Sequence, residues 1–190
     1  MKIFKLGEEV LRKKAVPVKP EEINDSLRET FNEMFATMIE ADGVGLAAPQ
    51  IGDSRRYFVI IADDEIRRVF VNPQIIATSS ELCDYEEGCL SLPGFNETIR
   101  RPSKITVQAL NEFGKPFSLE ADGLLARIIQ HEYDHLEGIV YIDRGDPVFA
   151  AEVTEKMRKR LERAAKKEIE KAKKSAKIAA KIAAKEKAKI

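Results

Sequence analysis

The stretch GLLARIIQHEYDHL, residues 123–136, constrains the fold more than any other part of the chain. Its first half is almost entirely apolar, and its second half holds the chain's two histidines, His131 and His135. Gly138 follows as a signal for the end of a helix. A short helix this apolar is typical of the centre of a fold rather than its surface. We therefore expect a buried central helix with the rest of the chain around it.

Several short runs of β-branched and aromatic residues predict strands elsewhere in the chain. These runs are residues 57–62, 68–71, 74–77, 81–85, 105–110 and 117–120. Residues 111–116 predict a hairpin turn between the last two. Apolar residues at steps of three and four predict a helix over residues 20–40, with Pro20 in its first turn and Gly43 beyond its end. The expected fold class is α+β, with antiparallel strands surrounding the central helix and a basic helix at the C-terminus.

Length and composition narrow the class of protein. The chain has 190 residues, which suits one domain with an appendage. No stretch approaches the roughly 18 consecutive apolar residues that a membrane span needs, and the first residues lack the apolar segment of a secretory signal. Cys83 and Cys89 lie too close together for a useful structural disulfide, which is typical of a reducing compartment. We expect a cytoplasmic protein that binds neither membranes nor DNA.

The net charge of zero hides two oppositely charged regions. Residues 151–190 carry 15 Lys or Arg and 6 Asp or Glu, a net charge of +9, so the rest of the chain carries −9. Asp146 and Pro147 predict the cap and first turn of a third helix, which becomes rich in Lys and Ala. We expect a main domain over residues 1–146 and a basic helical tail over residues 147–190, frayed or disordered over roughly its last 15–20 residues.

The sequence HEYDH, His131 to His135, matches the H-E-x-x-H pattern of zinc peptidases. On a helix, residues i and i+4 lie about 40° apart around the axis, so both imidazoles share one face. Glu132 lies about 100° from His131 and can reach over the same metal. Two imidazoles and a nearby carboxylate are what a metal-activated water needs. The alternative is that both histidines are ordinary core residues, but their place on a central helix favours a metal site.

A hydrolytic metal site needs a third protein ligand and an open fourth position. One class of zinc peptidase takes a further histidine six residues on, and the chain contains none. A downstream glutamate is another option, with Glu152, Glu155 and Glu162 as candidates on a helix where Glu is expected anyway. The remaining candidate is Cys89, because thiolates suit zinc or ferrous iron and its neighbours are polar and turn-forming. Cys83, in a strand-like run, is expected to be structural.

Three stretches taken together resemble one family, peptide deformylase. They are GVGLAAPQ at residues 43–50, EGCLS at residues 87–91 and QHEYDH at residues 130–135. The resemblance covers roughly residues 1–145 and leaves the basic tail outside. It implies removal of the N-formyl group from the initiator methionine of nascent proteins, with release of formate. The domain of residues 1–146 would then be the catalytic one.

The resemblance also implies roles for individual residues. Cys89, His131 and His135 would bind one divalent metal ion per chain. Family members work with ferrous iron, and many accept zinc, nickel or cobalt.

Three further residues would carry the chemistry. Glu132 would be the general acid and base. The backbone N–H of Leu90 and the side-chain amide of Gln50 would stabilise the oxyanion.

Substrate contacts follow from the same resemblance. Backbone at Gly43, Val44 and Gly45 would pair with the substrate peptide as a strand would. Apolar candidates for a methionine slot are Val44, Leu90, Leu124 and Ile128. Some deformylases carry an arginine soon after EGCLS, whereas this chain has Gly94 to Glu97 there, so we do not transfer that role.

The tail and two rival functions complete the expectations. In family members a similar C-terminal helix docks on the ribosome near the exit tunnel, and a basic tail is attracted to RNA. The first rival is an H-E-x-x-H endopeptidase that cleaves internal peptide bonds and does not need Cys89. The second is a catalytically inactive, ribosome-associated binding protein, which the presence of Glu132 and Gln50 argues against.

Overall fold

The structure, a computed structural model, describes the backbone of residues 1–187 and the side chains of residues 1–176. Seven strands form two antiparallel sheets, one with the order β1-β2-β3-β6-β7 and one of β4 and β5. The strands of the larger sheet are β1 (Gly45–Ala47), β2 (Tyr57–Ile61), β3 (Arg67–Thr78), β6 (Lys104–Leu110) and β7 (Pro116–Asp122). The smaller sheet pairs β4 (Leu82–Gly88) with β5 (Asn96–Pro102). The expected α+β class with antiparallel strands is confirmed.

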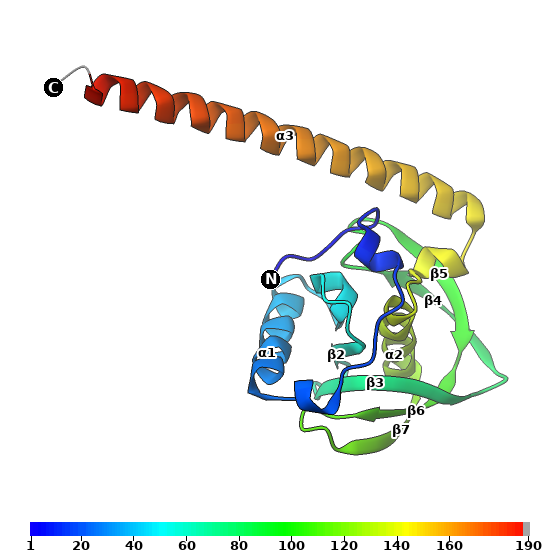
Figure 1. The fold of residues 1–190 in the computed structure, drawn as a ribbon. Coiled ribbons are helices and arrows are strands. Elements are labelled where there is room, and N and C mark those ends of the chain that lie inside the picture. Colours follow the sequence, from blue (N-terminus) through cyan, green and yellow to red (C-terminus); the bar gives the residue numbers. More distant parts are fainter. Residues whose placement is uncertain (188–190) are drawn as a thin grey trace.

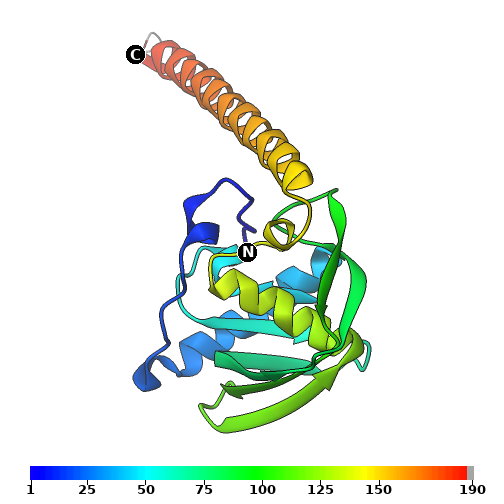
Figure 2. The ribbon, with the colours of Figure 1, turned by 90° about the vertical axis from the view of Figure 1, so that its right-hand side faces the viewer.

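Helix α2 (Gly123–Leu136) has the predicted bounds and lies at the centre of the body. Figures 1 and 2 show it between the larger sheet and the β4–β5 pair. Gly138, just beyond its end, has a positive φ of 75°. A Cβ added there would lie 2.8 Å from the backbone oxygen of Arg12, so only glycine fits this turn. The central helix therefore ends where the chain must turn sharply against the N-terminal segment.

The larger sheet separates two apolar clusters because strand side chains alternate between its faces. Phe58 and Ile60 of β2 face α2 and pack with Ile128 and Ile129. On the other face, the apolar side of α1 (Asp25–Glu40) packs against neighbouring strand residues. That second cluster contains Leu27, Phe31, Met34, Phe35 and Met38 of α1 with Leu46, Tyr57 and Val59 of the strands.

Helix α1 (Asp25–Glu40) begins later than predicted. Pro20–Glu22 forms a separate 3-10 turn, η2, and Asn24 caps α1 by accepting a hydrogen bond from Leu27 N–H at 3.2 Å. An asparagine cap ends the extended entry segment and satisfies a first-turn amide, which accounts for the late start. Three more 3-10 turns complete the body: η1 (Glu9–Arg12), η3 (Ala48–Ile51) and η4 (Tyr141–Arg144).

Some predicted strands differ in extent. The runs 68–71 and 74–77 are one strand, β3, with a register irregularity between Val71 and Gln74 where Asn72 has a φ of 50°. A bulge of this kind interrupts the alternation of side chains without ending the strand. Strands β1 and β5 were not expected, since β1 lies inside a Gly-rich loop and β5 is mostly polar.

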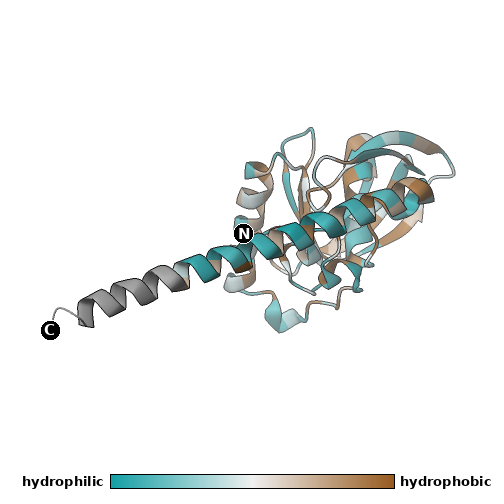
Figure 3. Ribbon diagram, turned by 90° about the horizontal axis from the view of Figure 1, so that it is seen from above, coloured by the Kyte–Doolittle hydropathy of each residue, from teal (hydrophilic) through white to brown (hydrophobic). Residues whose placement is uncertain are grey.

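Helix α3 (Pro147–Lys187) projects from the body, as Figure 1 shows. Its first turns are anchored because Val153 and Met157 are buried with Leu6, Leu92 and Tyr141 in a third apolar cluster. Figure 3 shows that the exposed length of α3 is mainly hydrophilic. The helix continues to Lys187, beyond the point where fraying was expected, and residues 188–190 lie outside the described residues. Within the described part of the chain, α3 and the other helices are all too polar or too short to cross a membrane.

Candidate metal centre and active site

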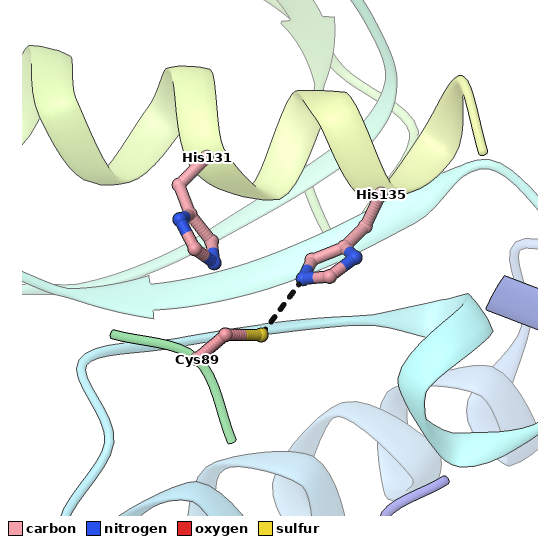
Figure 4. Close-up of side chains that lie close together, drawn as sticks. All are labelled: Cys89, His131 and His135. Atoms are coloured by element: carbon pink, nitrogen blue, oxygen red, sulfur yellow. Dashed lines mark hydrogen bonds between the residues drawn. The ribbon is translucent and has the colours of Figure 1, made fainter. Parts of the chain in front are cut away.

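Cys89, His131 and His135 come together at the centre of the body. His131 and His135 project from successive turns of α2, and their ring centroids are 5.2 Å apart. Cys89 directly follows β4, and its Sγ lies 3.2 Å from His135 Nε2 (Figure 4). One ligand atom from each residue lies within 4.8 Å of the other two. An ion with bonds of about 2.0–2.3 Å to nitrogen and sulfur can be held by donors this close.

The charge state of Cys89 suits metal binding. Burial disfavours the charged form, but the imidazoles of His135 and His131 outweigh it and hold the pKa of the Cys89 thiol well below its usual value. The thiolate is the form that ligates a metal. The donor set of one thiolate and two imidazoles therefore fits a borderline-soft divalent ion.

Glu87 fixes the orientation of His131. Its Oε2 lies 2.8 Å from His131 Nδ1, which leaves Nε2 of that ring on the side of Cys89. Burial opposes ionisation of Glu87, but hydrogen bonds from His131 and Arg101 outweigh it and hold the pKa of Glu87 well below the usual range. A carboxylate behind a metal-binding histidine fixes its tautomer and raises its basicity.

Glu87 belongs to a buried network of charges that joins α2 to the β4–β5 pair. Arg101 binds Glu87 through Nε at 2.7 Å and Asp134 through Nη1 at 2.6 Å. Arg127 of α2 donates to Glu87 at 2.8 Å, and Arg144 donates to Asp134 at 2.6 Å. Only Arg144 in this network is substantially exposed. The strands behind the site are thus connected to the helix that carries the histidines by paired charges.

Sequence reasoning missed this network. Arg127 stands beside Ile128 and Ile129 on a helix predicted to be buried, and a charge at such a position needs a partner. The charged Arg127 on a helix predicted to be buried was therefore the sequence feature that could have indicated the network. The identity of the partners depends on the pairing of β4 with β5, which was not expected.

Glu132 lies beside the group formed by Cys89, His131 and His135 and is 3% exposed. Its Oε2 has no hydrogen-bond partner among the described residues. Burial raises the pKa of Glu132 to about 7, against the opposing effect of the two histidines, and a bound cation would also oppose it. A Cβ added at Gly45 would lie 2.3 Å from Glu132 Oε1. Because Gly45 has no side chain, the carboxylate of Glu132 can occupy this space without a steric clash.

Gln50 and Leu90 are both neighbours of Cys89 and line the same pocket. Gln50 Oε1 accepts a hydrogen bond from Ala47 N–H at 2.7 Å. That bond directs Nε2 toward Cys89 Sγ, at 3.5 Å, and Ser91 Oγ, at 3.3 Å. Leu90 is half-buried and lines the same pocket. The side chain of Gln50 is thus preoriented toward the site.

A pocket of about 600 Å³ opens over these groups. The predicted substrate-binding residues Gly43, Val44, Gly45, Leu124 and Ile128 all line it. Gln50, Cys89, Leu90, His131 and Glu132 line it as well. Val44 is 48% exposed and lies at the rim, whereas Ile128 is 4% exposed and lies in the interior. His135 is 1% exposed and is not one of the residues that line the pocket. The structure therefore brings every predicted site residue to one place.

The other candidate ligands lie elsewhere. Glu152 and Glu162 are exposed on α3 and Glu155 is partly exposed there, and all three pair with Lys or Arg of the same helix. Cys83 accepts a hydrogen bond from Arg127 at 3.2 Å. In the part of the chain with described side chains, the group of potential metal ligands is Cys89, His131 and His135.

These features define a class: an α+β hydrolase with a thiolate-and-imidazole metal centre and a buried carboxylate beside it. Comparison with known proteins specifies the class further. The family profile described as Polypeptide deformylase matches residues 1–151. A peptide deformylase of Treponema pallidum (strain Nichols) is 49% identical over 146 residues, 77% of this chain and 88% of that protein.

Solved structures agree. A peptide deformylase from Legionella pneumophila superimposes with a TM-score of 0.78 at 44% identity, covering 86% of this chain and 96% of that one. Peptide deformylase 1B of Arabidopsis thaliana gives a TM-score of 0.80 at 33% identity, with 86% and 93% covered. The chain belongs to the polypeptide deformylase family, metal-dependent hydrolases that remove the N-formyl group from nascent peptides. The resemblance found in three motifs is confirmed, and the endopeptidase alternative is not favoured.

Proposed function

We propose that this chain hydrolyses the formyl group of the initiator methionine at the site formed by Cys89, Glu132, His131 and His135, releasing formate. The observation that carries the proposal is the convergence of three metal-binding donors with a buried carboxylate in one pocket. A divalent ion held there would polarise the formyl oxygen and lower the pKa of a water molecule.

Glu132 takes the proton of the attacking water and returns it to the leaving amine. Two features support this role: the carboxylate is buried beside the ligands, and its Oε2 is not engaged by another described residue. A base whose pKa is raised toward neutrality is matched to proton transfer near pH 7.

Gln50 Nε2 and the backbone N–H of Leu90 stabilise the negative charge of the tetrahedral intermediate. The bond from Ala47 N–H to Gln50 Oε1 supports this role because it holds the amide nitrogen toward the site before the substrate arrives. Losing one such donor costs about 2.7–4 kcal/mol of barrier in a comparable enzyme.

The substrate peptide lies along Gly43, Val44 and Gly45 and pairs with their backbone. The strand β1 that begins at Gly45 is at the edge of the larger sheet, where an added strand can bind. The methionine side chain occupies the apolar part of the pocket. Its walls would be Val44, Leu90, Leu124 and Ile128.

We expect one ferrous ion per chain in the cytoplasm, where nascent proteins are formylated. The site can also accept zinc, nickel or cobalt in a purified sample, since thiolate and imidazole ligands bind each of them. Metal analysis of protein purified without oxygen tests this assignment, and a calcium or magnesium ion at the site would contradict it.

We also propose that residues 147–190 form a tail, separate from the catalytic domain of residues 1–146, that docks on the ribosome near the exit tunnel. The net charge of +9 over residues 151–190 supports it, because basic segments bind RNA with strong salt dependence. Removal of residues 162–190 should weaken co-sedimentation with ribosomes at low salt. Equal co-sedimentation of the full and shortened chains would contradict the docking.

Two substitutions test the catalytic assignment. Glu132→Ala should keep the metal and lose nearly all turnover, because the proton carrier is gone while the ligands remain. Cys89→Ala should lose metal affinity, whereas an endopeptidase with its ligands elsewhere would retain it. Formate release and metal content are measured on the same samples. Unchanged formate release from either variant would overturn the proposal.

A further inference from the structure

Residues 4–6 of the chain connect the two segments that carry Gln50 and Leu90. Phe4 N–H donates to the backbone oxygen of Gln50 at 2.7 Å, and Leu6 N–H donates to that of Ser91 at 3.0 Å. Between them, Lys5 Nζ donates to the backbone oxygen of Leu90 at 2.7 Å. Three successive residues thus bind both the turn η3 and the loop after β4.

The side chain of Lys5 has an unusual position for a lysine. It is half-buried and lines the active-site pocket with Gln50, Cys89 and Leu90. Glu8 accepts a hydrogen bond from the backbone N–H of Lys5 at 2.6 Å. Among the described residues, however, no carboxylate lies within ion-pair distance of Lys5 Nζ. The hydrogen bond of its ammonium group goes to the carbonyl of Leu90.

The spacing of the two proposed oxyanion donors depends on such connections. Gln50 is oriented within its own turn by Ala47, while Leu90 belongs to a segment about 40 residues further along the chain. Among the described residues, the two segments are connected by the bonds that Gln50 Nε2 makes to Cys89 Sγ and Ser91 Oγ, by apolar packing of Leu90, and by the hydrogen bonds of residues 4–6. Preorganised donors stabilise a developing charge only if they hold their geometry to a fraction of an ångström.

We propose that residues 4–6 brace the oxyanion site and that Lys5 is a positioning residue for deformylation, acting through the carbonyl of Leu90. The inference rests on the proposed function of Gln50 and Leu90. Removing the Lys5 ammonium leaves the Leu90 carbonyl without its donor and allows the loop after β4 to shift. A displacement of about 1 Å at a reacting centre can cost up to 100-fold in rate.

The test uses the full chain with Lys5→Met, which keeps length and apolar stem but removes the donor. We expect kcat for formyl-Met-Ala-Ser to fall about tenfold, with KM, metal content and melting temperature unchanged. Lys5→Arg should restore most of kcat because it donates to the same carbonyl. Lys2→Met is the matched control, since Lys2 is exposed and pairs with Glu8 away from the pocket.

Hydrogen exchange separates positioning from a general loosening of the N-terminal segment. In Lys5→Met the amides of Phe4 and Leu6 should stay protected, because their backbone bonds remain. The inference is overturned if Lys5→Met keeps full kcat, if Lys2→Met loses as much, or if activity falls in step with metal content and amide protection. Failure of the proposed function would look different, since the unsubstituted chain would then release no formate.

Discussion

Helices α2 and α3 contain similar kinds of charged residue and use them in opposite ways. Of the 14 residues of α2, nine are buried, and two of its charged side chains, Arg127 and Asp134, bind partners on other elements. Along α3, the described side chains that are buried are Val153 and Met157, and its charges pair mainly within the helix. The comparison shows that a charged side chain positions the active-site residues only where it is buried and bound to partners on other elements.

The contributions of these ion pairs to stability also differ between the two helices. An exposed ion pair between neighbouring turns of a helix contributes only about 0.3–0.5 kcal/mol. A buried pair need not stabilise the fold relative to apolar residues, but removing one partner leaves an uncompensated charge. The network around Asp134 and Glu87 should therefore be sensitive to single substitutions, and the pairs along α3 should not.

The largest effect is expected for Arg101→Met. Arg101 is 3% exposed and binds both Glu87 and Asp134. Its removal leaves two buried carboxylates with fewer partners and should cost about 3–5 kcal/mol in the free energy of unfolding. Urea denaturation measures the cost. Metal affinity should fall as well, because Glu87 orients His131.

The matched control is Arg158→Met on α3. Arg158 has a side chain 55% exposed and binds Glu155 one turn away. The expected cost is less than about 0.5 kcal/mol. Similar losses from Arg101→Met and Arg158→Met would break the distinction between the two helices.

A smaller effect, on rate rather than stability, is expected for Gly45→Ala. The new Cβ would occupy space within 2.3 Å of Glu132 Oε1, so the carboxylate must move. We expect kcat to fall by about 10–100-fold with little change in melting temperature, since a flexible side chain can absorb the contact. Steady-state formate release measures it. A stable variant with full kcat would show that the position of Glu132 is not critical.

Part of this arrangement could be predicted from the sequence. The bounds of α2 followed from its apolar pattern and the glycine beyond it. Cys89 was a candidate ligand because the two histidines needed a third donor, and the resemblance of three motifs to one family implied that role. These features depend on local periodicity and on ligand chemistry, both of which are visible in a linear sequence.

The remainder depends on contacts between distant segments. The partners of Glu87 and the contact of Lys5 with Leu90 require knowing that β4 pairs with β5 and that the N-terminal residues cross the site. Strand β5 also lacks the alternation of apolar residues that predicts a strand, because its buried positions are Ile99 and the charged Arg101. The pattern of residues within one segment does not reveal which distant segment it pairs with.

Asp53→Asn should lower the free energy of unfolding at neutral pH by about 1 kcal/mol, a value discounted for solvent screening. The loss should depend on pH. Burial disfavours the charge of Asp53, but hydrogen bonds from Arg55 and Tyr57 outweigh it and lower the pKa of Asp53. The contribution is present above the unfolded-state pKa of about 3.9 and is lost as pH falls through the lower folded-state pKa. Urea denaturation between pH 7 and pH 3 should show the two proteins converging in acid.

Glu152→Gln is the corresponding control on α3, where the side chain is 60% exposed. It should leave the stability unchanged at every pH. A pH-independent loss for Asp53→Asn would mean that packing, and not charge, accounts for the effect.

The smallest effect is expected for removal of residues 162–190. This change keeps Val153 and Met157 in their cluster and removes the part of α3 beyond its anchored turns. Turnover of a formylated tripeptide should be unchanged, and the free energy of unfolding should stay within about 0.5 kcal/mol. A fall in kcat would show that the distal helix supports the site and would sharpen the comparison with α2.

The most direct test of the central claim combines two measurements on one anaerobically purified sample of the full chain. Formate release from formyl-Met-Ala-Ser is followed while the metal content per chain is determined, before and after chelation. The account predicts one divalent ion per chain, formate in equal amount to the free amine, and loss of both ion and activity on chelation. Turnover that persists in metal-free protein, or a fully loaded protein that releases no formate, would contradict it.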